Sequence, residues 1–443
     1  MTDSSPASRH FAETVVYKLH EAGYQAVFAG GCVRDLLLGA TPKDYDVATD
    51  ARPEYIRNLF GKHRTLAVGE SFGVVVVIPS RRDREGGVLP VEVATFRTDG
   101  DYRDGRHPEQ VEFATPEQDA QRRDFTINGM FLEPIDNRVL DFVGGFDDLH
   151  KRRIRAIGDP HARMREDKLR LLRAVRFTAT LDFELDLETS AAVREMAEEL
   201  TIVSAERIAQ ELRRMLVHAS RARAMELCLE HGLLGVILPE LLHHVRDATS
   251  HKPDAWPRTL RRLAGLTEPS FELAMAALLA VLLCPACPDV FPVVVIEKIL
   301  QRLRLSNAES ERITWLLAHF GQLDDFPAMA LARKKRLASF SGIRELVALE
   351  QARAAAADGD QSPVTACVDF LTATPSEIID PPPLLTGADL IAFGLRPGPQ
   401  FGTLLDSVRD AQLNETISNR EEALTLVRLI ATEITEGTED ESE

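Results

Sequence analysis

The pattern of hydrophobic residues changes once along this sequence, near Asp159. Before it, short apolar runs such as AVFA, VVVVI and VEVA alternate with short helical stretches; after it, leucines and alanines recur at helical spacing, with few breaks, as far as Glu436. Side chains on one face repeat every two residues in a strand and every 3.6 in a helix. The sequence therefore predicts an α+β protein, with a small N-terminal head on a mixed β-sheet followed by an all-α neck, body and tail.

Loops rich in glycine, proline and polar residues divide the chain further. A length of 443 residues exceeds what one small core accommodates, so several regions are expected. We expect an N-terminal helix within residues 1–25, a head at 26–150, a neck at 151–235, a helical body and tail at 236–430, and an acidic disordered end at 431–443.

The charge distribution is uneven. The net charge is −17, which by itself disfavours nucleic acid as a partner, because phosphate binding depends on Lys and Arg. Between Lys151 and Arg176, however, ten Lys or Arg stand against only Asp159, Glu166 and Asp167. This basic segment is either an ordinary solvated face or a surface that binds phosphates.

Several classes of protein are disfavoured. The longest apolar run, which starts at Glu272, is too short for a membrane span and predicts a buried helix. The N-terminus lacks the pattern of a secretory leader. The five cysteines are few and odd in number, which disfavours a disulfide scaffold. We therefore expect a cytoplasmic protein with reduced thiols, no membrane partner and no evident protein partner. Cys284 and Cys287 lack a second ligand pair, so no structural zinc is expected.

The stretch AGGCVRDLLLGATPKDYDVATD carries the strongest chemical signal. Asp44 and Asp46 flank one residue on an expected strand, and a period of two places both carboxylates on one face. Paired carboxylates suit Mg²⁺, whose shell is completed by water and substrate phosphates. Upstream, Gly30 and Gly31 end a strand and open a helix that could hold a triphosphate, and Arg34 could add a charged contact.

Each half of this signal has a simpler explanation. Two aspartates spaced one apart occur by chance, and a glycine pair is often only a turn. The order strand, glycine turn, helix and paired aspartates nevertheless favours a site for nucleotidyl transfer.

The stretch GGCVRDLLLG…KDYDVAT resembles the head motif of the DNA-polymerase-β-like nucleotidyltransferases. The similarity is to the class II branch, which holds the bacterial and eukaryotic tRNA CCA-adding enzymes and the bacterial poly(A) polymerases. Further stretches resemble that branch in the right order, from about residue 25 to 220: VGESFGVVVV, VEVATFRTDGDYRDGRHPEQVEF, RRDFTINGM, DFVGGFDDLHKRRIR, REDKLRLLRAVRF and SAERIAQELRRML.

The resemblance implies roles for residues that spacing alone does not single out. Glu92 matches a third acidic group near the metal ions. In RRDFTIN, Arg122 and Arg123 match residues that meet phosphate or base, while Asp124 and Asn128 match groups that hydrogen-bond the sugar hydroxyls.

The stretch EDKLRLLRAVR predicts one continuous helix with Asp167, Arg170 and Arg173 along a polar stripe. A carboxylate beside a guanidinium can pair with the Watson–Crick edge of cytosine or adenine, which both offer an amine next to a ring acceptor. In the family the residues matching Asp167 and Arg170 act as a protein template, and Arg176 matches a further nucleotide contact. The alternative is an ordinary i,i+3 salt bridge on an exposed helix.

Two small departures from the family pattern are Ala94, where threonine is usual, and Gly129, where alanine is usual. A later segment faintly resembles a metal-phosphohydrolase domain of some relatives, but Arg258 stands where a ligand histidine is wanted, so we expect no such activity.

The resemblance implies template-independent transfer of CMP and AMP from CTP and ATP to the 3′ end of tRNA, with Mg²⁺ as cofactor. The loop RTDGDYRDGRHPEQ, which CC-only relatives lack, is intact and favours full CCA addition. The alternatives are an A-adding enzyme, a poly(A) polymerase, a nucleotidyltransferase acting on small molecules or, from another class, a non-catalytic RNA-binding protein.

Overall fold

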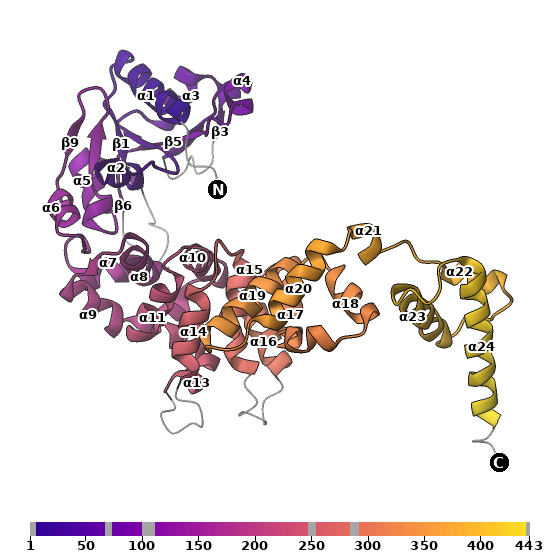
Figure 1. Ribbon diagram of the computed structural model, residues 1–443. Coiled ribbons are helices and arrows are strands. Elements are labelled where there is room, and N and C mark those ends of the chain that lie inside the picture. The colour runs from indigo at the N-terminus through magenta and orange to yellow at the C-terminus, as the bar shows by residue number, and fades with distance from the viewer. Residues whose placement is uncertain (1–5, 67–72, 100–110, 247–253, 284–291, 440–443) are drawn as a thin grey trace. The chain divides into compact units, whose positions relative to one another are not determined.

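The computed structural model describes residues 6–66, 73–99, 111–246, 254–283 and 292–439 (Figure 1). The chain forms two compact units. Unit 1 comprises residues 1–242 with 302–304, and unit 2 comprises residues 243–301 with 305–443. All the residues expected to bind nucleotide lie in unit 1.

A seven-stranded sheet forms the centre of the head. Its order is β3-β4-β5-β2-β1-β8-β9, and β2 pairs with β5 in parallel while the other neighbours are antiparallel. The expected mixed sheet is therefore confirmed. The strands are β1 (Ala26–Ala29), β2 (Asp46–Thr49), β3 (Thr65–Leu66), β4 (Val74–Val77), β5 (Val91–Thr95), β8 (Phe131–Glu133) and β9 (Arg138–Leu140).

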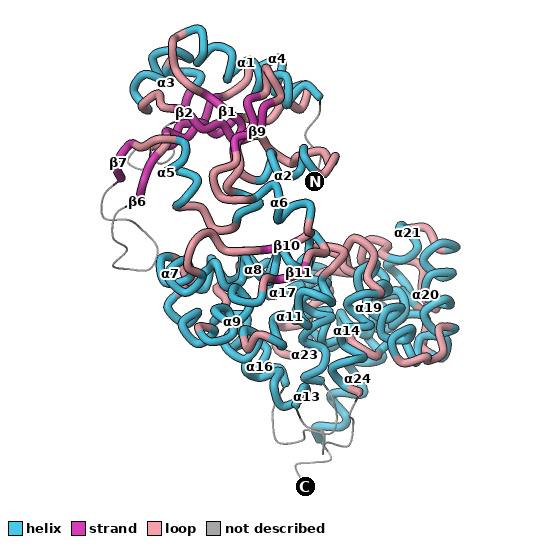
Figure 2. The backbone as a smooth tube through the Cα atoms, turned by 90° about the vertical axis from the view of Figure 1, so that its left-hand side faces the viewer, coloured by secondary structure: helices cyan, strands magenta, loops and turns pink. Residues whose placement is uncertain are grey.

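Helices cover both faces of this sheet. Figure 2 shows α1 (Pro6–Glu21) and α3 (Pro53–Phe60) above the strands, with α2 (Gly31–Leu37) and α5 (Pro116–Gln121) below. Because both faces are covered, all four residues of β1 are buried. The head also contains η1 (Lys62–Arg64), α4 (Arg81–Glu85), the hairpin β6 (Arg97–Asp99) and β7 (Val111–Phe113), η3 (Thr126–Asn128) and α6 (Gly145–His150).

The neck packs around α8 (Leu169–Leu181). Leu171, Leu172 and Val175 are buried, and α8 contacts α10 and α11. Two short strands, β10 (Arg153–Ile154) and β11 (Glu184–Leu185), pair in parallel and interrupt the helices. The other elements are α7 (Pro160–Glu166), α9 (Leu187–Glu195), η4 (Ala197–Ile202), α10 (Ala205–Leu216), α11 (Arg221–Glu230), α12 (Leu233–Ile237) and η5 (Pro239–Leu241).

The described secondary-structure elements of unit 2 are all helices. The apolar run from Glu272 forms the buried helix α15 (Phe271–Leu279), as expected, and no helix among the described residues is long and apolar enough to cross a membrane. The other elements, of which α13 and α16 each straddle a boundary with unit 1, are α13 (Leu242–Arg246), α14 (Ala255–Ala264), η6 (Ala280–Leu283), α16 (Pro292–Arg302), α17 (Asn307–Ala318), η7 (Gln322–Ala328), α18 (Leu331–Ala338), α19 (Ile343–Ala356), α20 (Ser362–Ala373), α21 (Ser376–Ile379), α22 (Gly387–Ala392), α23 (Gln400–Leu413) and α24 (Arg420–Glu439).

The last helix corrects one expectation. The sequence predicted disorder from residue 431, but α24 continues to Glu439. Apolar residues in EALTLVRLIATEI keep a helical spacing across this point, which favours continuation of the helix.

Candidate active site

The glycine pair follows β1 directly. Gly30 precedes α2 with φ 75°, a conformation that favours glycine, and its N–H donates to the Met130 carbonyl at 3.4 Å. A Cβ on Gly30 would lie 3.2 Å from Arg123 Nη1, and one on Gly31 would lie 3.6 Å from Arg34 Nη2. The two glycines therefore lie directly beside two guanidinium groups.

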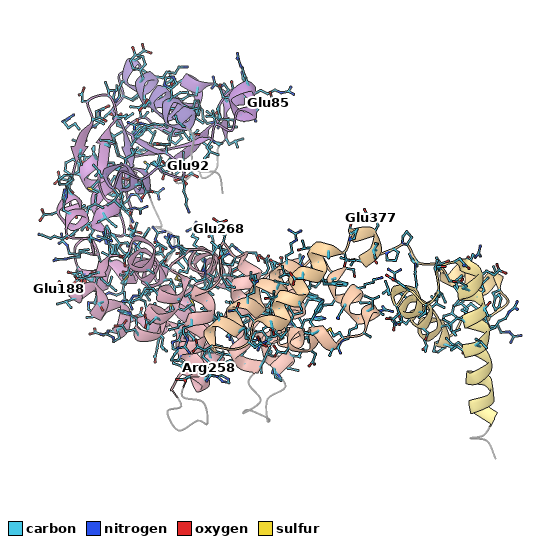
Figure 3. All side chains as sticks on the ribbon, in the orientation of Figure 1. Glu85, Glu92, Glu188, Arg258, Glu268 and Glu377 are labelled. Atoms are coloured by element: carbon cyan, nitrogen blue, oxygen red, sulfur yellow. The ribbon has the colours of Figure 1, made fainter. Side chains whose placement is uncertain are left out.

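Asp46 is the first residue of β2, beside the end of β1. Its Cα pairs in register with Ala29 on β1 and with Glu92 on β5. Glu92 is exposed at the surface of the head (Figure 3). Asp44 precedes the strand, so the expectation that both aspartates lie on it is wrong: the strand pairing begins only at Asp46. The glycine turn at the end of β1 and the acidic residues at the start of β2 and β5 nevertheless lie together at one end of these neighbouring strands.

The acidic residues are close enough to influence one another. The pKa of Asp46 is raised to about 7: burial is the largest cause, the carboxylates of Asp44 and Glu92 also raise it, and Arg123 partly offsets them. Mutual repulsion among hard oxygen ligands is what a divalent cation relieves. Among the described residues, no group of three or more His, Cys, Asp and Glu side chains forms a complete metal site. The donor set fits a cation that also takes ligands from water and substrate.

The two arginines of RRDFTIN share one partner that the sequence analysis missed. Arg122 Nη2 lies 2.7 Å from Asp119 Oδ1, and Arg123 Nη2 lies 2.9 Å from Asp119 Oδ2. Arg123 also lies over the Phe131 ring, at 4.9 Å. The spacing i,i+3 and i,i+4 from Asp119 is a helical signal that could have identified this carboxylate.

Asp124 and Asn128 join the head to the neck. Arg34 Nη1 donates to Asn128 Oδ1 at 2.8 Å, Asn128 Nδ2 donates to Asp124 Oδ1 at 3.1 Å, and Arg173 Nε donates to Asp124 Oδ2 at 2.8 Å. Burial raises the pKa of Asp124, but the Arg173 guanidinium outweighs burial and holds that pKa well below its usual range. The Asp124 carboxylate is therefore ionised and already accepts hydrogen bonds from Asn128 and Arg173. A sugar hydroxyl would have to donate to the same carboxylate oxygens.

Three guanidinium groups lie close to the ring of Phe177 on α8. Those of Arg34, Arg173 and Arg176 lie 5.3, 5.2 and 4.1 Å from its ring centroid. Burial lowers the pKa of Arg176 to about 10, so this group stays protonated at neutral pH, and its Nε donates to Glu211 Oε2 at 2.6 Å. Phe177 and Glu211 lie in stretches that resemble the family, but the sequence alone predicted no role for either residue. Each guanidinium also pairs with a carboxylate, Arg34 with Asp35, Arg173 with Asp124 and Arg176 with Glu211. A bound phosphate would therefore share the arginine N–H groups with these carboxylates.

The expected continuous helix around Asp167 is wrong. α7 ends at Glu166, Asp167 is extended at φ −145° and ψ 107°, and α8 begins at Leu169. Asp167 Oδ1 instead accepts the Leu169 N–H at 3.0 Å, and the Asp167 carbonyl accepts the Arg170 N–H at 3.0 Å. Aspartate competes for backbone N–H groups in this way, and so favours helix starts over helix interiors.

The alternative i,i+3 salt bridge is not formed either. Asp167 accepts two hydrogen bonds from Arg207 on α10, whereas Arg170 is buried and donates to the carbonyls of Arg163 and Arg122, at 2.8 and 3.0 Å. Arg170 also pairs with Glu166. The two residues expected to select the base are thus held separately by other groups.

Some expectations lie outside the described residues. These are residues 100–110 of the loop carried by the hairpin β6–β7, residues 247–253 of the phosphohydrolase-like segment, and the pair Cys284 and Cys287. The three described cysteines, Cys32, Cys228 and Cys367, are buried free thiols.

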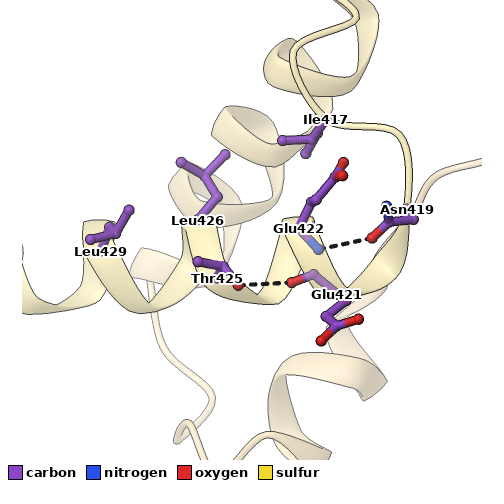
Figure 4. Close-up of a pocket in the computed structure, with 7 residues that line it drawn as sticks. All are labelled: Ile417, Asn419, Glu421, Glu422, Thr425, Leu426 and Leu429. Carbon is purple, nitrogen blue, oxygen red and sulfur yellow. Dashed lines mark hydrogen bonds between the residues drawn. The ribbon is translucent and has the colours of Figure 1, made fainter.

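A shallow pocket in unit 2 lies along the start of α24 (Figure 4). Glu421 and Glu422 line it together with apolar side chains, among them Ile417, Leu426 and Leu429. Two carboxylates in an apolar depression disfavour a triphosphate or an RNA backbone. The arginine-rich site in unit 1 remains the candidate active site.

Three family models match this chain. Residues 26–155 match the family described as Poly A polymerase head domain, residues 182–244 the RNA and SrmB-binding site of polymerase A, and residues 281–427 the tRNA nucleotidyltransferase domain 2. The chain is 41% identical to a CCA-adding enzyme of Bacillus pumilus over 220 residues, which are 49% of this chain and about half (52%) of that protein.

Two further matches extend along the whole chain. A CCA-adding enzyme of Lactococcus lactis subsp. cremoris is 30% identical over 424 residues, which cover 93% of this chain and 94% of that enzyme. The crystal structure of the Bacillus stearothermophilus CCA-adding enzyme in complex with CTP is 29% identical with a TM-score of 0.74, covering 98% of this chain and 100% of that one. This chain therefore belongs to the family of CCA-adding enzymes.

Proposed function

We propose that this chain adds the sequence CCA, or its missing part, to the 3′ end of tRNA, using CTP and ATP without a nucleic-acid template. A relative named CCA-adding enzyme matches this chain over 94% of its own length, and one similar structure is a CCA-adding enzyme in complex with CTP. The match of residues 281–427 to a tRNA nucleotidyltransferase domain supports tRNA as the acceptor.

One observation carries the assignment of the reaction. Asp46 lies in register with Ala29, next to the Gly30 turn, and with Glu92 on the other neighbouring strand. An acidic cluster beside a glycine turn with two guanidinium groups is what transfer of a nucleotide from a triphosphate needs.

Asp44 and Asp46, with Glu92, would hold divalent cations, which we propose to be Mg²⁺. Such ions, when bound, lower the pKa of an attacking hydroxyl and neutralise charge on a leaving pyrophosphate. The tRNA 3′ oxygen would bond to the α-phosphorus of the nucleotide while the bond to the pyrophosphate oxygen breaks.

The guanidinium groups around the turn would bind the triphosphate. Arg34 and Arg123 lie beside Gly30 and Gly31, and Arg173 and Arg176 surround Phe177. Arginine binds phosphate oxygens through a rigid fork of donors, so these groups would orient the α-phosphorus as well as attract the nucleotide. Arg122, Asp124 and Asn128 would complete the contacts to sugar and phosphate.

Asp167 and Arg170 would select the base. The Asp167 carboxylate would accept from the exocyclic amine of cytosine or adenine while Arg207 holds it. Arg170 would donate to the neighbouring ring nitrogen, and for this its guanidinium would have to turn from the carbonyls of Arg163 and Arg122. Uracil or guanine would oppose a carbonyl to Asp167, and each such mismatch costs about 1–3 kcal/mol.

The remaining assignments are also proposals. The head would span 26–150, the neck 151–235, and the body and tail 236–430, and the basic neck would hold RNA by backbone and shape. Three buried free thiols suit a reducing compartment, so we propose that the protein acts in the cytoplasm.

Product length tests the function. Purified protein is incubated with Mg²⁺, both CTP and ATP, one of them labelled, and tRNA that lacks all three terminal nucleotides, lacks only the last, or is complete. We expect addition of three, one and no nucleotides. A long ladder of A on complete tRNA would instead identify a poly(A) polymerase, a possibility raised by the match of residues 26–155 to a poly(A) polymerase head.

A further inference from the structure

Asp119 on α5 has a buried carboxylate that no step of the proposed reaction uses. Its side chain is 2% exposed. Oδ1 accepts from Arg122 Nε at 2.9 Å and from the backbone N–H of Arg97 at 3.3 Å; Oδ2 accepts from Arg123 Nε at 3.1 Å and Nη2 at 2.9 Å. Each oxygen therefore faces a separate guanidinium.

The two arginines each lead to a different part of the candidate site. Arg123 Nη1 lies 3.2 Å from the position of a Cβ on Gly30 and donates to the Asn128 carbonyl at 3.4 Å. The carbonyl of Arg122 accepts from Arg170 Nη2 at 3.0 Å. Asp119 thus holds the Arg123 guanidinium, which lies beside the glycine turn. It also holds Arg122, whose carbonyl accepts from Arg170.

The third contact of Asp119 reaches the hairpin β6–β7. Arg97 is the first residue of β6, and its Cα pairs with that of Phe113 at the base of the hairpin. Asp119 therefore ties the start of this hairpin to the same two arginines.

The charge balance of this cluster favours an anionic ligand. Burial raises the pKa of Asp119, but the guanidinium groups of Arg123 and Arg122 outweigh it and leave the pKa below its usual value. One carboxylate against two guanidinium groups leaves one positive charge among these three side chains.

We propose that Asp119 is a positioning residue for nucleotide binding, which holds the Arg123 guanidinium beside Gly30 and the Arg122 main chain against Arg170. This inference rests on the proposed function, because it assigns the nucleotide to that same site. Asp119 does not touch the nucleotide; it acts through the two arginines.

The test is a double-mutant cycle of Asp119→Asn and Arg123→Lys, with the KM for CTP, kcat and the melting temperature measured for each variant. An amide cannot accept from guanidinium groups on both sides, so Asp119→Asn should raise the KM for CTP about tenfold and change kcat less. When Arg123 is already lysine, Asp119→Asn should raise the KM for CTP by less than a further factor of about two. Both substitutions disturb the same pairing of Asp119 with Arg123, so their effects should not add. Equilibrium binding of CTP should weaken in parallel.

The matched control is Asp147→Asn, which removes an exposed aspartate paired with Lys151 at 2.7 Å. Its KM should equal that of the wild type. An unchanged KM for Asp119→Asn, with only a lower melting temperature, would overturn the inference while the proposed function stands. A wild type that incorporates no nucleotide would instead overturn the proposed function.

A second variant covers the case in which Asp119→Asn does not fold. Asp119→Glu keeps the charge but displaces it by one methylene. A KM for CTP raised at least about threefold at an unchanged melting temperature supports the inference, and an unchanged KM overturns it.

Discussion

Arg207 on α10 donates to both carboxylate oxygens of Asp167, from Nη1 to Oδ1 at 3.1 Å and from Nη2 to Oδ2 at 2.7 Å. The residue proposed to select the base is thus oriented by another helix. A fork of two parallel hydrogen bonds fixes a carboxylate more strictly than one ammonium group does.

We expect Arg207→Lys to weaken base selection. The Asp167 carboxylate would keep a charged partner but lose its fixed orientation, so the ratio of UMP to CMP incorporation should rise about 5- to 10-fold. Competition between CTP and UTP on tRNA lacking all three terminal nucleotides measures this ratio. Arg223→Lys, at an exposed arginine paired with Glu226 at 2.9 Å, is the control. An unaltered ratio in Arg207→Lys would contradict the role.

Phe177→Leu should weaken nucleotide binding. The ring contributes to holding Arg34, Arg173 and Arg176, and each cation–π contact contributes about 0.5–2 kcal/mol, so the KM for CTP and ATP should rise about 5- to 10-fold. Steady-state kinetics provide the measurement.

Phe183 offers a matched control for Phe177. It is equally buried, at 7% exposed, and lies 5.3 Å from one guanidinium, that of Arg152. Phe183→Leu should lower the melting temperature but leave the KM unchanged. Equal KM values for both variants would show that the three arginines do not depend on Phe177.

Asp46 should make stability depend on pH. Its pKa is raised from 3.8 to about 7 in the folded chain, first by burial and then by Asp44 and Glu92. The folded state therefore binds more protons than the unfolded state between about pH 4 and pH 7, so stability falls as pH rises through that window. Asparagine does not ionise, so Asp46→Asn removes this loss of stability at higher pH.

The free energy of unfolding of Asp46→Asn, relative to wild type, should therefore increase by about 2 kcal/mol between pH 5 and pH 8. Urea unfolding in the presence of a chelator measures it, with the exposed Asp136→Asn as control. If the difference in unfolding free energy between Asp46→Asn and wild type stays constant with pH, the pKa of Asp46 is not raised in the folded chain.

Gly129→Ala should destabilise the head by about 1–3 kcal/mol through overpacking. A Cβ there would lie 2.8 Å from Val143 Cγ2 and 3.0 Å from Ile157 Cδ1. The alanine that the family resemblance leads us to expect at this position would therefore be crowded. In a Val143→Ala background the penalty should shrink by about 1 kcal/mol, as measured by urea unfolding. Strictly additive effects would mean that the methyl group fits elsewhere.

The glycine turn and Asp46 could be predicted from sequence because they lie on consecutive elements. Gly30 follows one strand, Asp46 starts the next, and antiparallel pairing of β1 with β2 brings them to one edge. The period of two then extended the strand too far, to Asp44, since a local pattern does not show where the pairing begins.

The other partners could not be predicted because they are distant in sequence. Arg207 and Glu211 lie one turn apart on α10, and each holds a site residue on or beside α8. Nothing in their own neighbourhood in the sequence indicates those contacts. The break at Asp167 was hidden for a different reason: the flanking residues favour a helix, and only the side chain's hydrogen bond to the Leu169 N–H shows the helix start.

The most direct test of the acidic cluster is single-turnover incorporation of CMP by Asp46→Ala and wild type, at saturating CTP and Mg²⁺, on tRNA lacking all three terminal nucleotides. Binding of the tRNA is measured in parallel by gel shift. The rate should fall at least about a thousandfold while tRNA binding stays unchanged. Incorporation by Asp46→Ala at a rate close to that of wild type would contradict the assignment of the reaction to this edge of the sheet.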